Sequence, residues 1–269
     1  MGSRRSGRGR VAALAALLSA ALGAAASGQG LQTLSTADDN RGWEAVGRLN
    51  LDGGGFCTGA LITSEIVLTA AHCLFDRRTD TLMAADAIEF QPGLRFGRAE
   101  AYRGVRRIVV HPDYDIGDPD RLERVGADLA LIELARPVRL GHVRPFQTRF
   151  DVKVGQTVQV VSYAKTRADA PSREADCAVL AKDLTMLVLS CEAEFGASGA
   201  PVFAEFEGEM RIVSVISAKA QWGGQPVALA SVMGGRMDAL LDAFARTPAL
   251  APVGKTISVG ETAAKGDGP

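Results

Sequence analysis

Short apolar segments, separated by Gly, Asp, Asn and Pro, recur along most of this chain and limit its fold more than any other feature. Each is a few residues long and rich in Val, Ile and Leu, and no 3.6-residue period connects one to the next. The segments lie at 59–62, 66–69, 87–90, 107–110 and 129–132, and then at 157–161, 186–189, 200–203, 211–216 and 226–229. This pattern predicts an all-β fold built of barrels or a sandwich. At 269 residues and 47% hydrophobic, the chain can bury the core of one large domain or of two small ones.

Only one stretch, residues 236–245, has a convincing helical pattern. Its apolar residues fall on one helix face: Met237, Leu240, Leu241 and Phe244. We therefore expect a helix near the C-terminus. Residues 248–269 contain Gly, Pro and Lys with little to bury, and we expect them to form a mobile tail.

Residues 1–26 are typical of a secretory signal peptide. Several arginines precede an apolar run at 11–22, and Ala24, Ala25 and Ala26 provide an Ala-x-Ala cleavage site. The run is too short to span a bilayer. We therefore expect a secreted or periplasmic protein that has no membrane association after cleavage. The net charge of −1 and the scattered basic residues argue against a nucleic-acid partner.

The four cysteines all lie beyond this cleavage site, and an even number in an oxidising compartment indicates disulfide bonds. They are Cys57, Cys73, Cys177 and Cys191. The residues alone permit three pairings. Bridges between neighbours would close loops of roughly 15 residues, each stabilising the fold by about 3 kcal/mol. No Cys-x-x-Cys spacing occurs, so we expect no metal site at these thiols.

The segment Phe195-Gly-Ala-Ser-Gly-Ala-Pro201 places a serine, Ser198, between glycines in a predicted tight turn. Such a turn exposes the hydroxyl and brings backbone N–H groups close together. Acyl transfer needs both: an oxygen nucleophile, and donors directed at the oxyanion that forms when the nucleophile attacks a carbonyl. Because Gly-x-Ser-Gly also occurs in ordinary turns, the motif needs a base and an orienting acid elsewhere.

His72 and Asp128 are the candidates for those two groups. His72 follows the segment 66–69 and precedes Cys73, and Asp128 opens the segment 129–132. A carboxylate there is costly to bury unless it is hydrogen-bonded, and an imidazole N–H is a suitable partner. Taken singly, each residue also has a purely structural interpretation, as a satisfied polar side chain or a strand-end acid. The other histidines, His111 and His142, are expected to be structural.

Three blocks together resemble the signature of the chymotrypsin-fold serine proteases. They are Leu-Thr-Ala-Ala-His-Cys at 68–73, Asp-Leu-Ala-Leu at 128–131 and Gly-Ala-Ser-Gly-Ala-Pro at 196–201. Their order of His, Asp and Ser is that family's order, and the pattern is closest to bacterial secreted members such as the glutamyl endopeptidases. The resemblance implies two six-stranded antiparallel Greek-key barrels with a C-terminal helix. Residues 42–145 would carry His72 and Asp128, and residues 146–247 would carry Ser198.

The resemblance also implies a role for each residue. Ser198 would be the nucleophile, His72 the general base and acid, and Asp128 the acid that holds the imidazolium, as in the established triad. The backbone N–H groups of Gly196 and Ser198 would form the oxyanion hole. Ser217 would hydrogen-bond Asp128. Disulfide bonds would join Cys57 to Cys73 and Cys177 to Cys191.

Substrate recognition is where the chain departs most from the family pattern. Ala197 replaces the acid that pairs with a new N-terminus in the digestive enzymes, so activation of that kind is excluded. Ile216 stands where the glutamyl enzymes carry a histidine, which argues against a preference for Glu. The candidate substrate-binding residues are Glu192, Phe195, Ser217, Ala218 and Lys219. Residues 217–219 would offer an edge on which a substrate lies as an added strand.

The sequence therefore predicts a serine endopeptidase that acts on polypeptides as a monomer, without cofactor or metal. An α/β-hydrolase esterase is excluded because its histidine follows its serine, and this chain has no histidine after His142. A catalytically silent binding module on the same fold stays open as the alternative.

Overall fold

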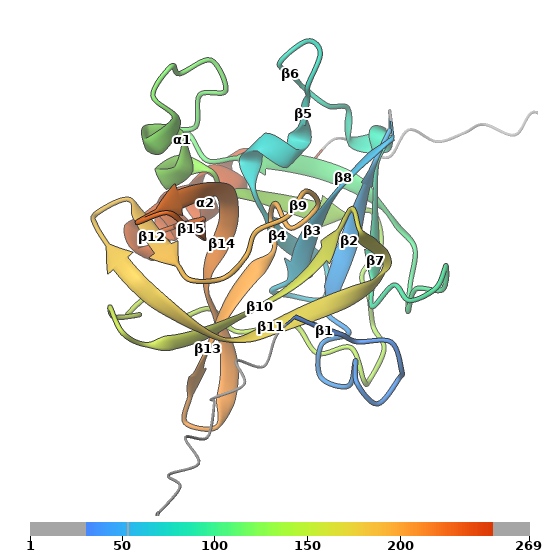
Figure 1. Cartoon of the computed structure of the whole chain (residues 1–269). Helices are drawn as coiled ribbons and strands as arrows, with labels where there is room; N and C mark the ends of the chain where they lie inside the picture. Colours follow the sequence, from blue (N-terminus) through green and yellow to red (C-terminus); the bar gives the residue numbers. More distant parts are fainter. Residues whose placement is uncertain (1–30, 53, 250–269) are drawn as a thin grey trace, which may run out of the picture.

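Two β-barrels lie side by side in the computed structural model, which describes residues 31–52 and 54–249 (Figure 1). The first is a closed barrel of six antiparallel strands: β2 (Val46–Leu51), β3 (Gly55–Leu61), β4 (Ile66–Thr69), β7 (Ile88–Pro92), β8 (Arg103–Val110) and β9 (Ala130–Leu134). The second contains β10 (Thr157–Ala164), β11 (Arg167–Lys182), β12 (Met186–Leu189), β13 (Pro201–Phe206), β14 (Glu209–Trp222) and β15 (Gln225–Ser231). The predicted fold class is confirmed.

Both barrels have the same Greek-key connectivity. In each, the first three strands follow one another around the barrel and the last three run in the reverse order, so that the fourth strand pairs with the first. The second barrel closes because the long strand β11 pairs with β10 and also with β12. The short strand β1 (Gln32–Thr33) adds to β11 from outside.

The predicted apolar segments coincide with strands, but two barrel strands have no such segment: β2 and, more notably, β11. Its sequence alternates small, charged and apolar residues, and its first half is stabilised by pairing on both sides, with β1 and β10. Two short hairpin strands, β5 (Phe75–Asp76) and β6 (Thr81–Leu82), project from the first barrel (Figure 1). Two short 3₁₀ turns are η1 (Ala71–Leu74) and η2 (Ala85–Ala87).

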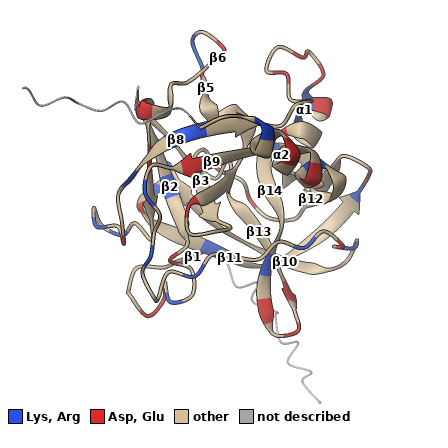
Figure 2. Ribbon diagram, turned by 180° about the vertical axis from the view of Figure 1, so that it is seen from behind, with Lys and Arg blue, Asp and Glu red and all other residues tan. Residues whose placement is uncertain are grey.

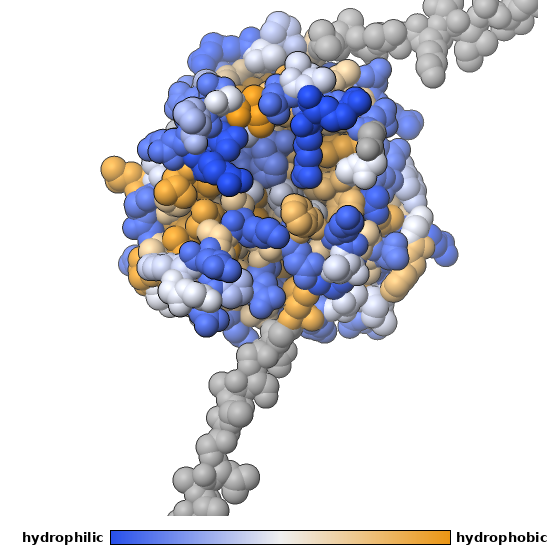
Figure 3. Space-filling model, turned by 45° about the horizontal axis from the view of Figure 1, so that its top comes forward, coloured by the Kyte–Doolittle hydropathy of each residue, from blue (hydrophilic) through white to orange (hydrophobic). Residues whose placement is uncertain are grey.

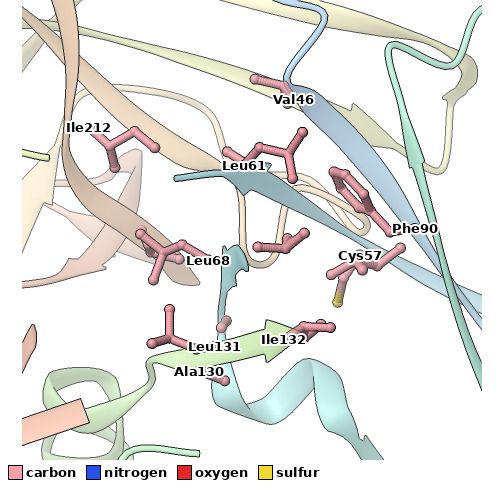
Figure 4. Packing of buried hydrophobic residues seen from close by; sticks show 14 of the residues in the cluster. Val46, Cys57, Leu61, Leu68, Phe90, Ala130, Leu131, Ile132 and Ile212 are labelled. Carbon is pink, nitrogen blue, oxygen red and sulfur yellow. The ribbon is translucent and has the colours of Figure 1, made fainter. Parts of the chain in front are cut away.

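The main core crosses the interface between the barrels. Figure 4 shows Ile212 of β14 in one cluster with Leu61 and Leu68 of the first barrel, all of them at most 1% exposed. Trp43 and Phe203 add an edge-to-face contact with ring centroids 5.0 Å apart. Burial of this shared surface fixes the relative position of the two barrels, and therefore of any residues that meet between them.

The C-terminal helix is present as α2 (Gly234–Arg246). Met237 and Leu240 are buried against the core, but Leu241, which we expected on the same face, is 44% exposed. The helix is tied to β8 by Arg107, whose guanidinium stacks on the Phe244 ring at 3.9 Å and donates to the Phe244 carbonyl. Figure 2 shows basic residues on β8 next to an acidic position on β9. Glu133 of β9 pairs with both Arg106 and Arg107.

A second helix, α1 (Arg121–Ala127), was not anticipated from the sequence. It is only seven residues long, and the Asp120 carboxylate caps it by accepting from the N–H groups of Leu122 and Glu123. Among the described residues, no helix is both long and apolar enough to cross a membrane. The signal peptide expected at 1–26 and most of the tail expected at 248–269 lie outside the described residues.

Candidate active site

His72 stands in the turn η1, directly after β4. The disulfide between Cys57 and Cys73 joins this turn to β3, with the two Cα atoms 6.1 Å apart. Ala70 and Ala71 are fully buried, which anchors the turn, while the His72 side chain stays 23% exposed. The histidine is therefore held rigidly but can still be reached from outside.

Asp128 lies at the end of α1 and is 2% exposed. Its carboxylate accepts hydrogen bonds from the His72 backbone N–H at 2.8 Å, from His72 Nδ1 at 2.6 Å and from the Ser217 hydroxyl. These three donors offset the cost of burying the charge. Because a carboxylate can only accept, His72 Nδ1 carries the proton in this pair, and Nε2 is left as the acceptor that a general base needs.

Ser217 reaches Asp128 because of an irregularity in β14. The pairing of β14 with β15 shifts register between Ile216 and Ala218, so that Ser217 is the extra residue of a bulge. Bulges commonly redirect a side chain in this way. The structure thus contains the expected hydrogen bond from the Ser217 hydroxyl to Asp128, although the two residues lie 89 positions apart in the sequence.

Ser198 lies in the loop between β12 and β13, and this loop is pressed against the first barrel. The Ser198 carbonyl accepts from the Thr58 N–H of β3 at 2.9 Å. A Cβ placed on Gly199, whose φ is +77°, would lie 2.2 Å from Thr69 Oγ1, at the end of β4. Only glycine allows this approach, and Thr69 is three residues before His72. The hydrogen bonds of the described residues join His72 to Asp128 but include none between His72 and Ser198.

Position 196 also accepts only glycine. Its φ is +101°, and a Cβ there would lie 2.4 Å from the Phe56 ring. The Gly196 carbonyl accepts from the Thr58 hydroxyl at 2.9 Å, and that hydroxyl also accepts from the Tyr163 N–H at 3.0 Å. Thr58 is completely buried. It connects the serine loop to both barrels, and the sequence patterns gave no sign of this because threonine is common in strands.

Two backbone N–H groups of the serine loop already donate to carbonyl groups in the described part of the chain, and the two that alternate with them do not. The Ala197 N–H donates to Glu194 at 3.1 Å and the Gly199 N–H to Ile216 at 2.8 Å, whereas no backbone acceptor among the described residues takes the N–H of Gly196 or Ser198. The Phe195 and Ala197 carbonyls share a peptide plane with these two N–H groups. They accept hydrogen bonds from the Lys165 N–H at 2.6 Å and the Ala200 N–H at 2.9 Å, respectively. Since a trans peptide directs its C=O and N–H to opposite sides, both N–H groups remain available to an outside acceptor.

The candidate substrate-binding residues fall into two places. Ser217, Ala218 and Lys219 lie along β14, and Lys219 Nζ sits 4.3 Å from the centroid of the exposed Phe195 ring. Glu192 is exposed, and its backbone N–H donates to both carboxylate oxygens of Glu174 at 3.0 Å.

Two further carboxylates near this loop were not anticipated from the sequence. Burial raises the pKa of the Glu174 carboxyl, although the Glu192 N–H opposes this shift. The pKa of Glu194 is lowered by hydrogen bonds, first from Thr166 and then from Arg167. Glu194 is thus an ionised anchor between the serine loop and the start of β11.

The disulfide pairing matches that implied by the family resemblance. Cys57 bonds to Cys73, and Cys177 bonds to Cys191 with Cα atoms 5.2 Å apart. The two groups of described residues with metal-ligand geometry both include a complete disulfide. Disulfide sulfurs have no thiolate to offer, so neither group is a credible metal site.

A double barrel in which a buried aspartate holds a histidine, together with a serine in a Gly-Ala-Ser-Gly loop, defines a protein of the chymotrypsin fold. Residues 35–226 match the trypsin family, and the chain belongs to that family. This confirms the resemblance noted in the sequence.

Individual relatives match only in part. The chain is 37% identical over 92 residues to a trypsin of Phaedon cochleariae, covering 34% of this chain and 32% of that protein. It is 28% identical over 166 residues to phenoloxidase-activating factor 1 of Holotrichia diomphalia, covering 54% of this chain and 43% of that protein. The chain thus spans less than half the length of these relatives. The structure of a Glu endopeptidase in complex with MPD superposes with a TM-score of 0.67 over 81% of this chain and 97% of that one, at 18% identity, and shares the fold.

Proposed function

We propose that this protein is a serine endopeptidase that hydrolyses peptide bonds through an acyl-enzyme intermediate. The observation that carries the proposal is the Asp128 carboxylate, which is buried and holds both the backbone and Nδ1 of His72. A buried acid in that position sets the tautomer of the imidazole and stabilises the imidazolium that forms when Nε2 takes a proton. A purely structural aspartate would not need to orient a partly exposed histidine ring.

In the first half of the reaction, Ser198 Oγ attacks the carbonyl carbon of the scissile bond while its proton passes to His72 Nε2. The carbonyl oxygen becomes an oxyanion, which accepts hydrogen bonds from the N–H groups of Gly196 and Ser198. The intermediate collapses when the C–N bond breaks, and His72 gives its proton to the leaving amine. In the second half, a water molecule repeats the sequence and releases the acid, and Ser198 regains its proton.

The setting of the reaction follows from the same features. The two disulfides favour an oxidising compartment, so we place the mature protein outside the cytoplasm, secreted or periplasmic, after removal of residues 1–26. The working unit is a monomer in which residues 42–145 contribute His72 and Asp128, and residues 146–247 contribute Ser198. The substrate is a polypeptide that lies along the edge of β14 at residues 217–219.

A fluorophosphonate probe tests this proposal, because it reacts only with an activated serine. We expect stoichiometric labelling of the folded protein and no labelling of Ser198→Ala. The control Ser64→Ala alters a serine in the turn between β3 and β4 and should leave labelling unchanged. Absence of labelling in a protein with native disulfides and a cooperative unfolding transition would favour the alternative, a catalytically silent binding module.

A further inference from the structure

A large hollow extends from the candidate active site over the first barrel. Its volume is 1270 Å³, and pockets of roughly 300–1,000 Å³ already enclose a drug-sized ligand. His72, Phe195 and Gly196 line one end of it, whereas none of residues 217–219 does. The hollow therefore reaches His72 and the serine loop, but its walls do not include the edge of β14 at residues 217–219.

The far walls of the hollow come from the ends of β2 and β3 and from the hairpin β5–β6, which Figure 1 shows projecting from the first barrel. Apolar side chains on these walls are Leu51, Phe56, Phe75, Leu82 and Met83. Figure 3, in which the side of the molecule that carries this hairpin is brought forward, shows apolar residues interspersed among hydrophilic ones. Such a mixture suits an extended peptide better than a purely apolar ligand.

The charged residues that line the hollow are mainly basic. They are Arg48, Arg77, Arg78 and Lys165, against Asp52 and Asp76. Asp76 is already engaged within its own hairpin, because its carboxylate accepts from the Arg78 N–H at 2.8 Å and from the Arg78 guanidinium at 3.4 Å. Once this internal pair is set aside, three basic groups face a single carboxylate. The excess charge favours an acidic occupant.

Arg48 is the most firmly placed of these basic groups. Its guanidinium lies 4.5 Å from the centroid of the Phe56 ring and donates to the Ala168 carbonyl at 3.3 Å. Its Nε is buried and has no hydrogen-bond partner among the described residues. A stacked guanidinium of this kind loses little side-chain entropy when it binds a carboxylate, so it can contribute more than a mobile surface lysine.

We propose that this hollow binds the part of the substrate that follows the scissile bond, and that it selects acidic side chains there. The inference rests on the proposed function. His72 gives its proton to the leaving amine, so the segment that carries this amine leaves on the histidine side, which is the side that the hollow occupies. An extended segment advances about 3.3 Å per residue, and its first few residues therefore pass Arg48, Arg77 and Lys165.

The experiment uses two peptide pools with identical randomised residues before the scissile bond. In one pool the positions after it are rich in Asp and Glu, and in the other they are rich in Lys. Cleavage products are identified and quantified by mass spectrometry. We expect the acidic pool to be cleaved about tenfold faster, which corresponds to a few exposed ion pairs. The ratio should approach unity at about 1 M salt, where charges are screened beyond roughly 3 Å.

Charge-reversed variants locate the preference on the protein. Arg77→Glu combined with Lys165→Glu should abolish or invert the ratio between the pools. Arg139→Glu is the matched control, because Arg139 is exposed and does not line the hollow, and its ratio should equal that of the unaltered protein. A protein that reacts with the fluorophosphonate probe but cleaves both pools equally would overturn this proposal alone. A protein that neither reacts nor cleaves would overturn the proposed function, and this inference with it.

Discussion

The hydroxyl of Thr58 offers a direct test of how the serine loop is held. This side chain is fully buried, donates to the Gly196 carbonyl at 2.9 Å and accepts from the Tyr163 N–H at 3.0 Å. Thr58→Val keeps the shape of the side chain and removes both bonds. Each of the two buried groups that loses its partner costs about 1–3 kcal/mol, so we expect the free energy of unfolding to fall by about 2–6 kcal/mol.

Catalysis should suffer separately from stability. Gly196 supplies one of the two expected oxyanion donors, and complete loss of such a donor costs about 10²–10³-fold in kcat. Thr58→Val loosens the donor but does not remove it, so we expect kcat to fall about tenfold with little change in KM. Thr58→Ser keeps the hydroxyl and should restore most of the kcat.

Denaturant titration and steady-state kinetics on one peptide substrate measure both effects. The control is Ser214→Ala, which removes a buried hydroxyl that donates to the Ser231 carbonyl at 2.6 Å, outside the serine loop. It should lower stability and leave kcat unchanged. The reasoning is refuted if Thr58→Val loses stability but keeps its kcat, or if Thr58→Ser loses as much kcat as Thr58→Val.

Three further outcomes follow from the structure. Burial lowers the pKa of His111, so below about pH 6.5 the unfolded chain binds a proton that the folded chain does not. The free energy of unfolding should therefore fall with decreasing pH, and it should fall less steeply in His111→Gln. Equal pH dependence of the two proteins in urea titrations would contradict this. Ser217→Ala removes one of the three donors to Asp128 and should lower kcat severalfold at unchanged KM; unchanged kinetics would show that the bond has no part in catalysis. Replacing Cys57 and Cys73 together by Ala opens a loop of 16 residues and should cost about 3 kcal/mol of stability; a thermal midpoint equal to that of the parent would be inconsistent with that cost.

The apolar segments of the sequence predicted most strands of both barrels, because strands that bury one or both faces must carry Val, Ile and Leu. They did not predict β2, in which apolar residues alternate with Gly, Arg and Asn. They also did not predict β11, whose 16 residues include three arginine or lysine residues and few apolar runs. This strand is stabilised by its neighbours on both sides, and pairing between strands distant along the chain leaves no local pattern. The helix α1 was missed for a related reason, since it depends on the Asp120 cap more than on an apolar face.

In the candidate site, too, the sequence predicted some residues and missed others. His72, Asp128 and Ser198 were identified from three separate blocks, and the structure joins the first two directly. Thr58 was not identified, although it holds Gly196 and Ser198, because its role depends on contacts with residues more than a hundred positions away. Glu174 and Glu194 were overlooked likewise, since nothing local separates them from exposed acids.

By itself the sequence determined most strands of both barrels, the glycine-containing turn that carries Ser198, and the order of the three reactive residues. These properties depend on backbone conformation and side-chain type, which are written locally in the chain. Only the tertiary structure decided that Ser217 hydrogen-bonds Asp128 and that Thr58 holds the serine loop. It also decided that basic residues as far apart in the sequence as Arg48 and Lys165 line one hollow. Contacts of this kind, between residues distant in the sequence, require the barrels to close and their shared core to be buried. That burial is a property of the whole chain.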